Sequence, residues 1–149
     1  IHIESDFPVS ESLIERAAST ALAHSAPEEA PEAGLSVVLA DDARLQALNR
    51  EYLGIDAPTD VLSFPASETD PETGGRYLGD ILISVPRARA QAEAAGHPLE
   101  SELQLLVVHG LLHLLGHDHA QAEDKARMWK AQAEVLERLG LGQIQIREE

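Results

Sequence analysis

The sequence predicts an α+β fold, with a small mixed sheet of about four strands packed against about five helices. Short β-branched or apolar runs alternate with longer segments in which apolar residues recur every three or four positions. The strand-like runs are separated both by short loops and by helix-length segments, so hairpin and crossover connections are expected in one sheet. The 149 residues contain no internal repeat, and we expect residues 1–149 to form a single domain.

The first two elements are a strand and a helix. Residues 1–4 alternate between apolar and polar side chains, as in a strand, and Ser10 can cap the helix that follows. The apolar stripe of that helix consists of Leu13, Ile14, Ala17, Ala18, Ala21 and Leu22. A proline-rich acidic connection, residues 26–34, leads to the next element.

A second strand and helix follow. The segment 35–40 is short and contains two adjacent β-branched valines, which predicts a strand. The two aspartates at 41 and 42 can cap a helix that runs to about Leu53. One side of this helix carries Leu45, Leu48 and Tyr52.

Two more strands are expected around a flexible loop at 71–77. Residues 60–64 lie between proline-bearing turns, and residues 79–85 contain the apolar side chains Ile81, Leu82, Ile83 and Val85. The segment 58–64 has two possible roles: a core strand whose entry is set by Pro58 and Thr59, or a strand whose backbone edge lies beside a cleft and binds an extended substrate. Both remain open at the level of the sequence.

Three helices complete the chain. Pro86 opens an alanine-rich helix that Gly96 ends, and a long helix follows from about 98 to 115 with Gly116 just past its end. The last helix covers about 121–139. Its expected apolar stripe is Ala122, Ala126, Trp129, Ala133 and Leu136, and its expected i,i+4 ion pairs are Glu123–Arg127 and Glu134–Arg138.

Composition restricts the possible functions. The 11 Lys and Arg stand against 26 Asp and Glu, and the net charge of −15 repels polyanions, so a nucleic-acid role requires a local basic patch. The chain has no Cys, which excludes disulfide partners and thiolate metal ligands. No apolar run approaches the roughly 20 residues that span a bilayer. We expect a cytoplasmic protein without a membrane partner.

The stretch HGLLHLLGHDHA, residues 109–120, points to a metal site. His109 and His113 lie one helical turn apart, with Cβ atoms about 5–6 Å from each other, so both imidazoles can reach one ion. Leu and Val surround this helix on every side, which predicts a buried, central helix, and buried imidazoles are costly without a partner. A shared cation would satisfy both.

A third histidine can join this pair. Gly116 allows a left-handed backbone turn, after which His119 can come round to the same ion. Three His ligands leave one tetrahedral position open, as catalytic zinc sites do, so we expect one Zn²⁺ per chain. Asp118 either orients a ligand as an outer hydrogen-bond acceptor or caps the last helix.

The residue after the first histidine is unexpected for a protease. Metzincin metalloproteases write this motif H-E-x-x-H-x-x-G-x-x-H, and the Glu serves as the general base. Position 110 is Gly, so peptide hydrolysis would lose its base. A metalloprotease that lacks this Glu is therefore the less favoured enzyme.

Three blocks together resemble the YbeY family of bacterial rRNA maturation factors, which are regarded as single-strand endoribonucleases. They are HGLLHLLGHDH, LNREYLGIDAPTDVLSFP (48–65) and LGDILIS (78–84), and the resemblance extends over nearly the whole chain. It implies an α+β fold, zinc held by His109, His113 and His119, and partners in ribosomal RNA and the small ribosomal subunit. It also implies a role in rRNA processing and ribosome quality control.

One position departs from the family pattern. Family members commonly carry an Arg where this chain has Leu53, and Leu cannot contact a phosphate as a guanidinium does. Other arginines are then the candidates for RNA binding: Arg50, Arg76, Arg87 and Arg89. Residues 76–89 hold three of them against one acid and form the only clearly basic segment of the chain, for which ordinary surface charge is the alternative interpretation. The competing interpretation is a non-catalytic ribosome-assembly factor with a vestigial zinc site, which Leu53 and the acidic charge favour.

Overall fold

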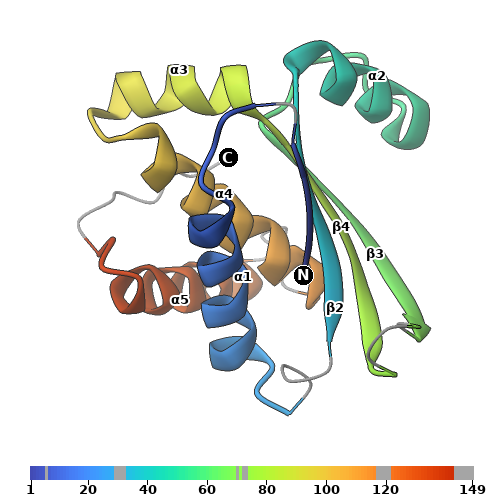
Figure 1. The fold of residues 1–149 in the computed structure, drawn as a ribbon, viewed down its shortest axis with the longest axis vertical. Helices are drawn as coiled ribbons and strands as arrows, with labels where there is room; N and C mark the ends of the chain where they lie inside the picture. Colours follow the sequence, from blue (N-terminus) through green and yellow to red (C-terminus); the bar gives the residue numbers. More distant parts are fainter. Residues whose placement is uncertain (6, 29–32, 70, 72–73, 117–121, 143–149) are drawn as a thin grey trace.

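The structure is a computed structural model that describes every residue except 6, 29–32, 70, 72–73, 117–121 and 143–149. The described residues form four strands and five helices, which confirms the predicted α+β fold (Figure 1). In chain order they are β1 (His2–Ser5), α1 (Glu11–Ser25), β2 (Gly34–Ala40), α2 (Asp42–Leu53), β3 (Val61–Thr69), β4 (Arg76–Ser84), α3 (Val85–Ala95), α4 (Leu99–Leu114) and α5 (Ala122–Arg138).

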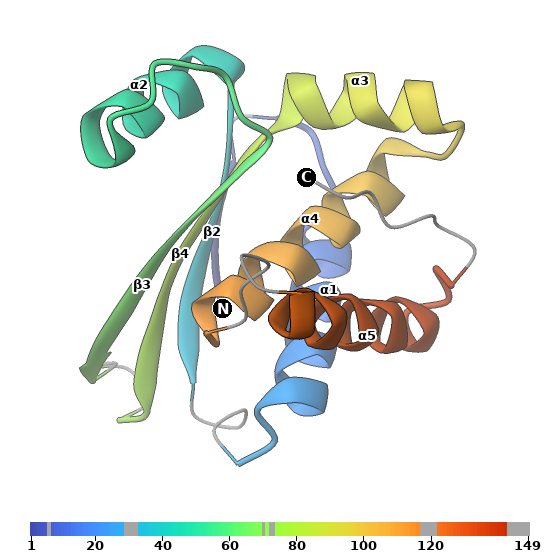
Figure 2. The same cartoon turned by 180° about the vertical axis from the view of Figure 1, so that it is seen from behind.

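The sheet has the strand order β1-β2-β4-β3 and is mixed. The β1–β2 and β2–β4 pairs are parallel, whereas β3 and β4 form an antiparallel hairpin. Helices α1, α4 and α5 lie on one side of the sheet, and α2 lies on the other side near the end where β4 leads into α3 (Figures 1 and 2). The register pairs Ser63 with Ile81 and Leu62 with Leu82. The side chains of the first pair lie on one face of the sheet and those of the second pair lie on the other.

Helix α4 lies at the centre of the main core. It contacts α1, α3, α5, β3 and β4, and every residue from 102 to 112 is buried. This burial confirms the prediction from its all-round apolar sequence. A smaller apolar cluster between α2 and the sheet contains Ala40, Leu45, Leu62 and Leu82. None of the helices in the described part of the chain is both long and apolar enough to cross a membrane.

The β3–β4 hairpin is longer than the sequence predicts. Strand β3 continues beyond position 64 to Thr69, and β4 begins at Arg76, inside the expected loop 71–77. Antiparallel pairs such as Thr69 with Arg76 extend the ladder through polar residues that carry no hydrophobic pattern. At the other end of β4, Val85 is the first residue of α3.

The buried face of helix α5 shares Leu136 with the predicted apolar stripe but differs from it at the alanines. Ala126 and Ala133 are exposed and Trp129 is half-buried, and Ala122 has no described side chain. The buried face consists of Met128, Gln132, Val135, Leu136 and the adjoining Leu139. Larger side chains fill the space beside α1 and α4, so the small alanines are left outside.

Two expected ion pairs of α5 have other partners. Arg127 binds Asp124. The carboxylate of Glu134 lies 2.7 Å from Nε2 of His24 on α1, and this hydrogen bond lowers the pKa of Glu134. On α2, Tyr52 lies on the same side as Leu45 and Leu48, as expected: its ring centroid is 5.4 Å from that of Phe64 on β3, although the side chain is 62% exposed.

Candidate metal centre and cleft

His109 and His113 converge as the four-residue spacing predicts. Both project from the last turns of α4, and their Nε2 atoms lie 3.2 Å apart. Only 8% of the surface of His109 is exposed, and His113 is half-buried. The arrangement therefore brings two ring nitrogens to one point at the boundary between core and solvent.

The second ring nitrogen of His109 has a partner on another helix. Its Nδ1 lies 2.9 Å from Oε1 of Gln132 on α5, in a contact that is buried on both sides. The indole ring of Trp129, the only Trp in the chain, lies 6.2 Å from the same imidazole between ring centroids. Gln132 lies outside the motifs that point to a site in the sequence. Its signal is a polar residue four positions after Met128, within the apolar face that the prediction misplaced.

The separation of the two Nε2 atoms suits a cation. Zinc binds imidazole nitrogen at about 2.0–2.1 Å, so two ligands on one edge of a tetrahedron lie about 3.3 Å apart. Among the described residues no group of three His, Asp or Glu side chains could hold a metal. The predicted third ligand, His119, and the predicted outer acceptor, Asp118, both lie outside the described residues. Gly116 precedes them with a φ of 94°, the left-handed turn that the sequence predicts.

A cleft of about 320 Å³ opens beside the two histidines. Most of its wall is the first half of β3 and the loop before it, and the described residues that line it are Leu53, Thr59, Asp60, Val61, Leu62, Ser63, Pro65, His109 and His113. β3 is the last strand in the sheet order, so its outer backbone edge lies beside this cleft. Because Leu62 is also buried against α2, the strand fits both of the roles left open above.

Gly110 is required by the packing of α4 on the sheet. A Cβ atom at this position would lie 2.8 Å from Cγ2 of Ile81 and 3.2 Å from Oγ of Ser63. The Ser63 hydroxyl donates a hydrogen bond of 3.1 Å to the Gly110 carbonyl, which holds the helix close to β3. The metzincin carboxylate is therefore not merely absent here, since a side chain at 110 would project into the sheet.

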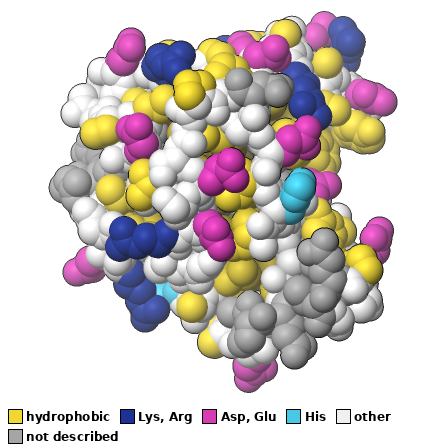
Figure 3. Space-filling view, in the orientation of Figure 1, with side chains coloured by type: hydrophobic (Ala, Val, Ile, Leu, Met, Phe, Trp, Pro, Cys, Tyr) yellow, Lys and Arg dark blue, Asp and Glu magenta, His cyan; other side chains and the backbone are white. Residues whose placement is uncertain are grey.

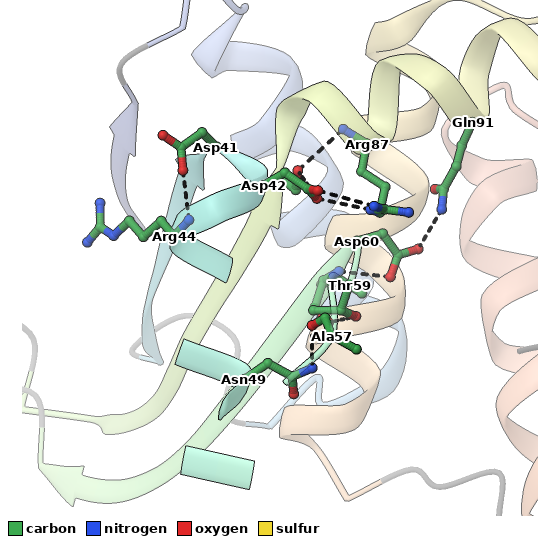
Figure 4. Close-up of polar contacts among 11 residues, drawn as sticks. Asp41, Asp42, Arg44, Asn49, Ala57, Thr59, Asp60, Arg87 and Gln91 are labelled. Atoms are coloured by element: carbon green, nitrogen blue, oxygen red, sulfur yellow. Dashed lines mark hydrogen bonds and ion pairs between the residues drawn. The ribbon is translucent and has the colours of Figure 1, made fainter. Parts of the chain in front are cut away.

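Buried polar contacts hold the cleft wall from behind (Figure 4). Asp60 is only 6% exposed, and its carboxylate accepts hydrogen bonds from the Val61 backbone and from Nε2 of Gln91 on α3. Asn49 on α2 donates to the Ala57 carbonyl at 3.0 Å. These bonds attach the loop that leads into β3 to two helices. Asp60 is the one carboxylate among the described residues of the cleft wall.

An ion pair joins the starts of α2 and α3 next to this wall. The Arg87 guanidinium donates two hydrogen bonds, of 3.0 and 3.1 Å, to the Asp42 carboxylate, and the Ser84 hydroxyl donates a third at 3.2 Å (Figure 4). The bonds from Arg87 lower the pKa of Asp42, and the same pair raises the pKa of Arg87. The predicted substrate-binding Arg87 is thus engaged in a structural pair.

The structure does not gather the four predicted RNA-binding arginines. Arg50 on α2 and Arg89 on α3 are exposed, while Arg76 begins β4 and Arg87 follows its end, about 25 Å along the strand. None of the four is among the described residues that line the cleft. Figure 3 shows the Lys and Arg side chains of one face in small separate groups with acidic side chains between them. Instead, Leu53 lines the cleft and is 56% exposed.

The chain is similar to known proteins over nearly its whole length. A family model described as Endoribonuclease YbeY matches residues 1–140. A protein named Endoribonuclease YbeY from Moorella thermoacetica is 46% identical over 146 residues, covering 93% of this chain and 94% of its own. A protein of the same name from Desulfitobacterium hafniense is 50% identical over 119 residues, or 76% of each chain. The solution structure of TM1509 from Thermotoga maritima covers 99% of this chain and 98% of its own, with a TM-score of 0.59 and 25% identity.

Proposed function

The chain belongs to the YbeY endoribonuclease family, and from this premise we propose that it is a zinc-dependent hydrolase that cleaves phosphodiester bonds of single-stranded RNA. Its role would be in rRNA maturation and ribosome quality control in the cytoplasm, on RNA of the small ribosomal subunit. The observation that carries the proposal is the approach of the His109 and His113 Nε2 atoms to 3.2 Å at the wall of a cleft.

The metal would be held by His109, His113 and His119, with Asp118 as an outer acceptor for one of them. All-nitrogen donors with an open fourth position fit a catalytic zinc ion. When bound, zinc would supply Lewis-acid chemistry to a phosphoryl oxygen and make a nucleophile available near neutral pH. The neutral imidazoles supply lone pairs, and the open edge of β3 offers backbone groups to an extended substrate.

The close packing at Gly110 counts against a metalloprotease. An amide leaving group needs a proton, and α4 has no room for the carboxylate that passes it on in metzincins. The alkoxide leaving group of a phosphodiester needs less protonation than an amine does. Digestion of casein by the zinc-loaded protein, at a rate that depends on the metal, would reverse this preference.

RNA binding would rest on the dispersed arginines Arg50, Arg76 and Arg89, with a smaller share from Arg87 because Asp42 already neutralises it. Leu53 in the cleft removes a cation that relatives commonly have, so we propose that cleavage is slow. The same feature favours the second candidate function, a ribosome-assembly factor with little cleavage. Cosedimentation with small subunits, by purified protein that does not cut RNA, would support that second function.

The test is metal content by elemental analysis together with cleavage of a single-stranded RNA. His113→Ala should lose both zinc and cleavage. His2→Ala is the matched control, because His2 is exposed on β1, and it should keep both at wild-type levels. Cleavage by metal-free protein, or by His113→Ala at the wild-type rate, would contradict the proposal.

A further inference from the structure

We infer that Gln132 on α5 is a positioning residue that holds His109 in the tautomer and orientation needed to bind a metal through Nε2. The inference deepens the proposed function and rests on it. The bond that carries it is the 2.9 Å contact between His109 Nδ1 and Gln132 Oε1.

The chemistry of the pair sets the direction of this bond. An amide oxygen accepts hydrogen bonds and cannot donate them, so the imidazole donates through Nδ1–H. A neutral imidazole has one N–H, and Nε2 therefore keeps its lone pair. That lone pair faces His113 Nε2, at the point where the two rings converge. Metal-binding imidazoles commonly donate their other N–H in this way, which fixes the ring and raises its basicity.

The position of Gln132 in the core also calls for such a role. It is 2% exposed and lies on the buried face of α5 among Met128, Val135 and Leu136. A polar side chain in an apolar face costs stability unless it is hydrogen-bonded. A leucine would pack there without this requirement. The contact with His109 is what the amide contributes that an apolar side chain does not.

The bond spans two helices, so α5 takes part in a site whose described ligands both lie on α4. Trp129 is one turn before Gln132, and its indole ring is tilted 53° to the His109 ring. Gln132 and Trp129, both on α5, therefore both contact the imidazole of His109 on α4. Zinc affinity should then depend on α5, although α5 provides none of the predicted ligands.

Three variants test the inference in the full chain. Gln132→Leu keeps the approximate size and removes the acceptor, whereas Gln132→Glu keeps an acceptor. Gln104→Leu is the matched control, since Gln104 is another buried glutamine, 5% exposed, on α4 and outside the cleft wall. Thermal unfolding of the metal-free proteins checks that each variant folds.

The first measurement is the Kd for zinc, by competition with a chromophoric chelator. Gln132→Leu should weaken zinc binding about 10–100-fold, the range found for such outer-shell partners. Gln132→Glu and Gln104→Leu should stay within about threefold of wild type, well below that range. Wild-type affinity in Gln132→Leu, or a tenfold loss in Gln132→Glu, would overturn the inference. Absence of zinc binding by the wild type would instead overturn the proposed function.

The second measurement needs neither metal nor activity. Nitrogen-15 NMR of the metal-free protein at about pH 8, where imidazole is neutral, reports which ring nitrogen carries the proton. His109 should be protonated at Nδ1 in the wild type and in Gln132→Glu, and should lose this preference in Gln132→Leu. A wild-type His109 protonated at Nε2 would overturn the inference even if zinc binds.

Discussion

The close approach of Gly110 to Ile81 predicts, for a double-mutant cycle, that Gly110→Ala destabilises the wild-type protein but stabilises a variant in which Ile81 is replaced by Ala. Ala is about 1 kcal/mol better than Gly inside a helix, so Gly110→Ala should be stabilising in the absence of other effects. A Cβ only 2.8 Å from Cγ2 of Ile81, which is fully buried, forces one of them to move. Overpacking of this kind costs about 1–3 kcal/mol. We therefore expect Gly110→Ala to lower the free energy of unfolding by up to about 2 kcal/mol.

The second arm of the cycle removes the obstacle. Ile81→Ala alone should cost about 2–5 kcal/mol, because it leaves a cavity in the main core. In that background the added methyl group at position 110 no longer meets Cγ2 of Ile81. Only the 3.2 Å approach to Oγ of Ser63 remains, so most of the helix gain of about 1 kcal/mol should appear as stabilisation. The coupling energy should then be about 1–3 kcal/mol, within the range for residues in contact.

The assay is urea unfolding of the four metal-free proteins, followed by circular dichroism. Equal m-values would show that the unfolded states are comparable. Should Gly110→Ala have the same effect in both backgrounds, the close approach of α4 to the sheet would not be the reason for glycine at this position. Stabilisation by Gly110→Ala in the wild-type background would refute the reasoning as well.

Three further outcomes are expected. Asp41 caps α2 by accepting a 2.7 Å bond from the Arg44 amide, so Asp41→Ala should lower the unfolding free energy by about 1 kcal/mol in urea titrations. The pKa of Asp42 lies below its ordinary 3.8. The advantage of wild type over Asp42→Asn should therefore be constant above about pH 5 and disappear as the pH falls through the lowered pKa, whereas an advantage that grows on acidification would contradict the pair. Leu53→Arg should speed RNA cleavage and steepen the log–log salt dependence of binding by about 0.7, whereas Ile55→Arg, equally exposed but outside the cleft wall, should not speed cleavage.

The part of the site that follows from local periodicity could be predicted from the sequence. His109 and His113 were identified because a helical turn joins positions four apart and leucines on every side imply burial. Gln132 and the Ser63–Gly110 bond were not, because each depends on how two distant elements pack. The sequence could show that position 110 lacks a carboxylate, but only the register of β3 and β4 against α4 explains the glycine.

The fold shows the same division. The strand and helix types are as predicted because each has its own pattern of apolar residues. The hairpin was underestimated because Thr69 and Arg76 pair through their backbones without an apolar signal. The face of α5 was misplaced because its alanines fit an apolar stripe equally well, and the choice between faces is made by α1 and α4.

Because α4 is surrounded by the core, the protein can fold without the metal ion that we propose for its site. Leucine and valine contacts on all sides of this helix, rather than coordination bonds, hold the two imidazoles in register. An ion would meet two ligands that are already in place and would not have to organise the backbone. In a zinc finger, by contrast, binding and folding are one event. Occupancy of the proposed site would then follow the free metal concentration, and the protein would stay folded when that concentration is low.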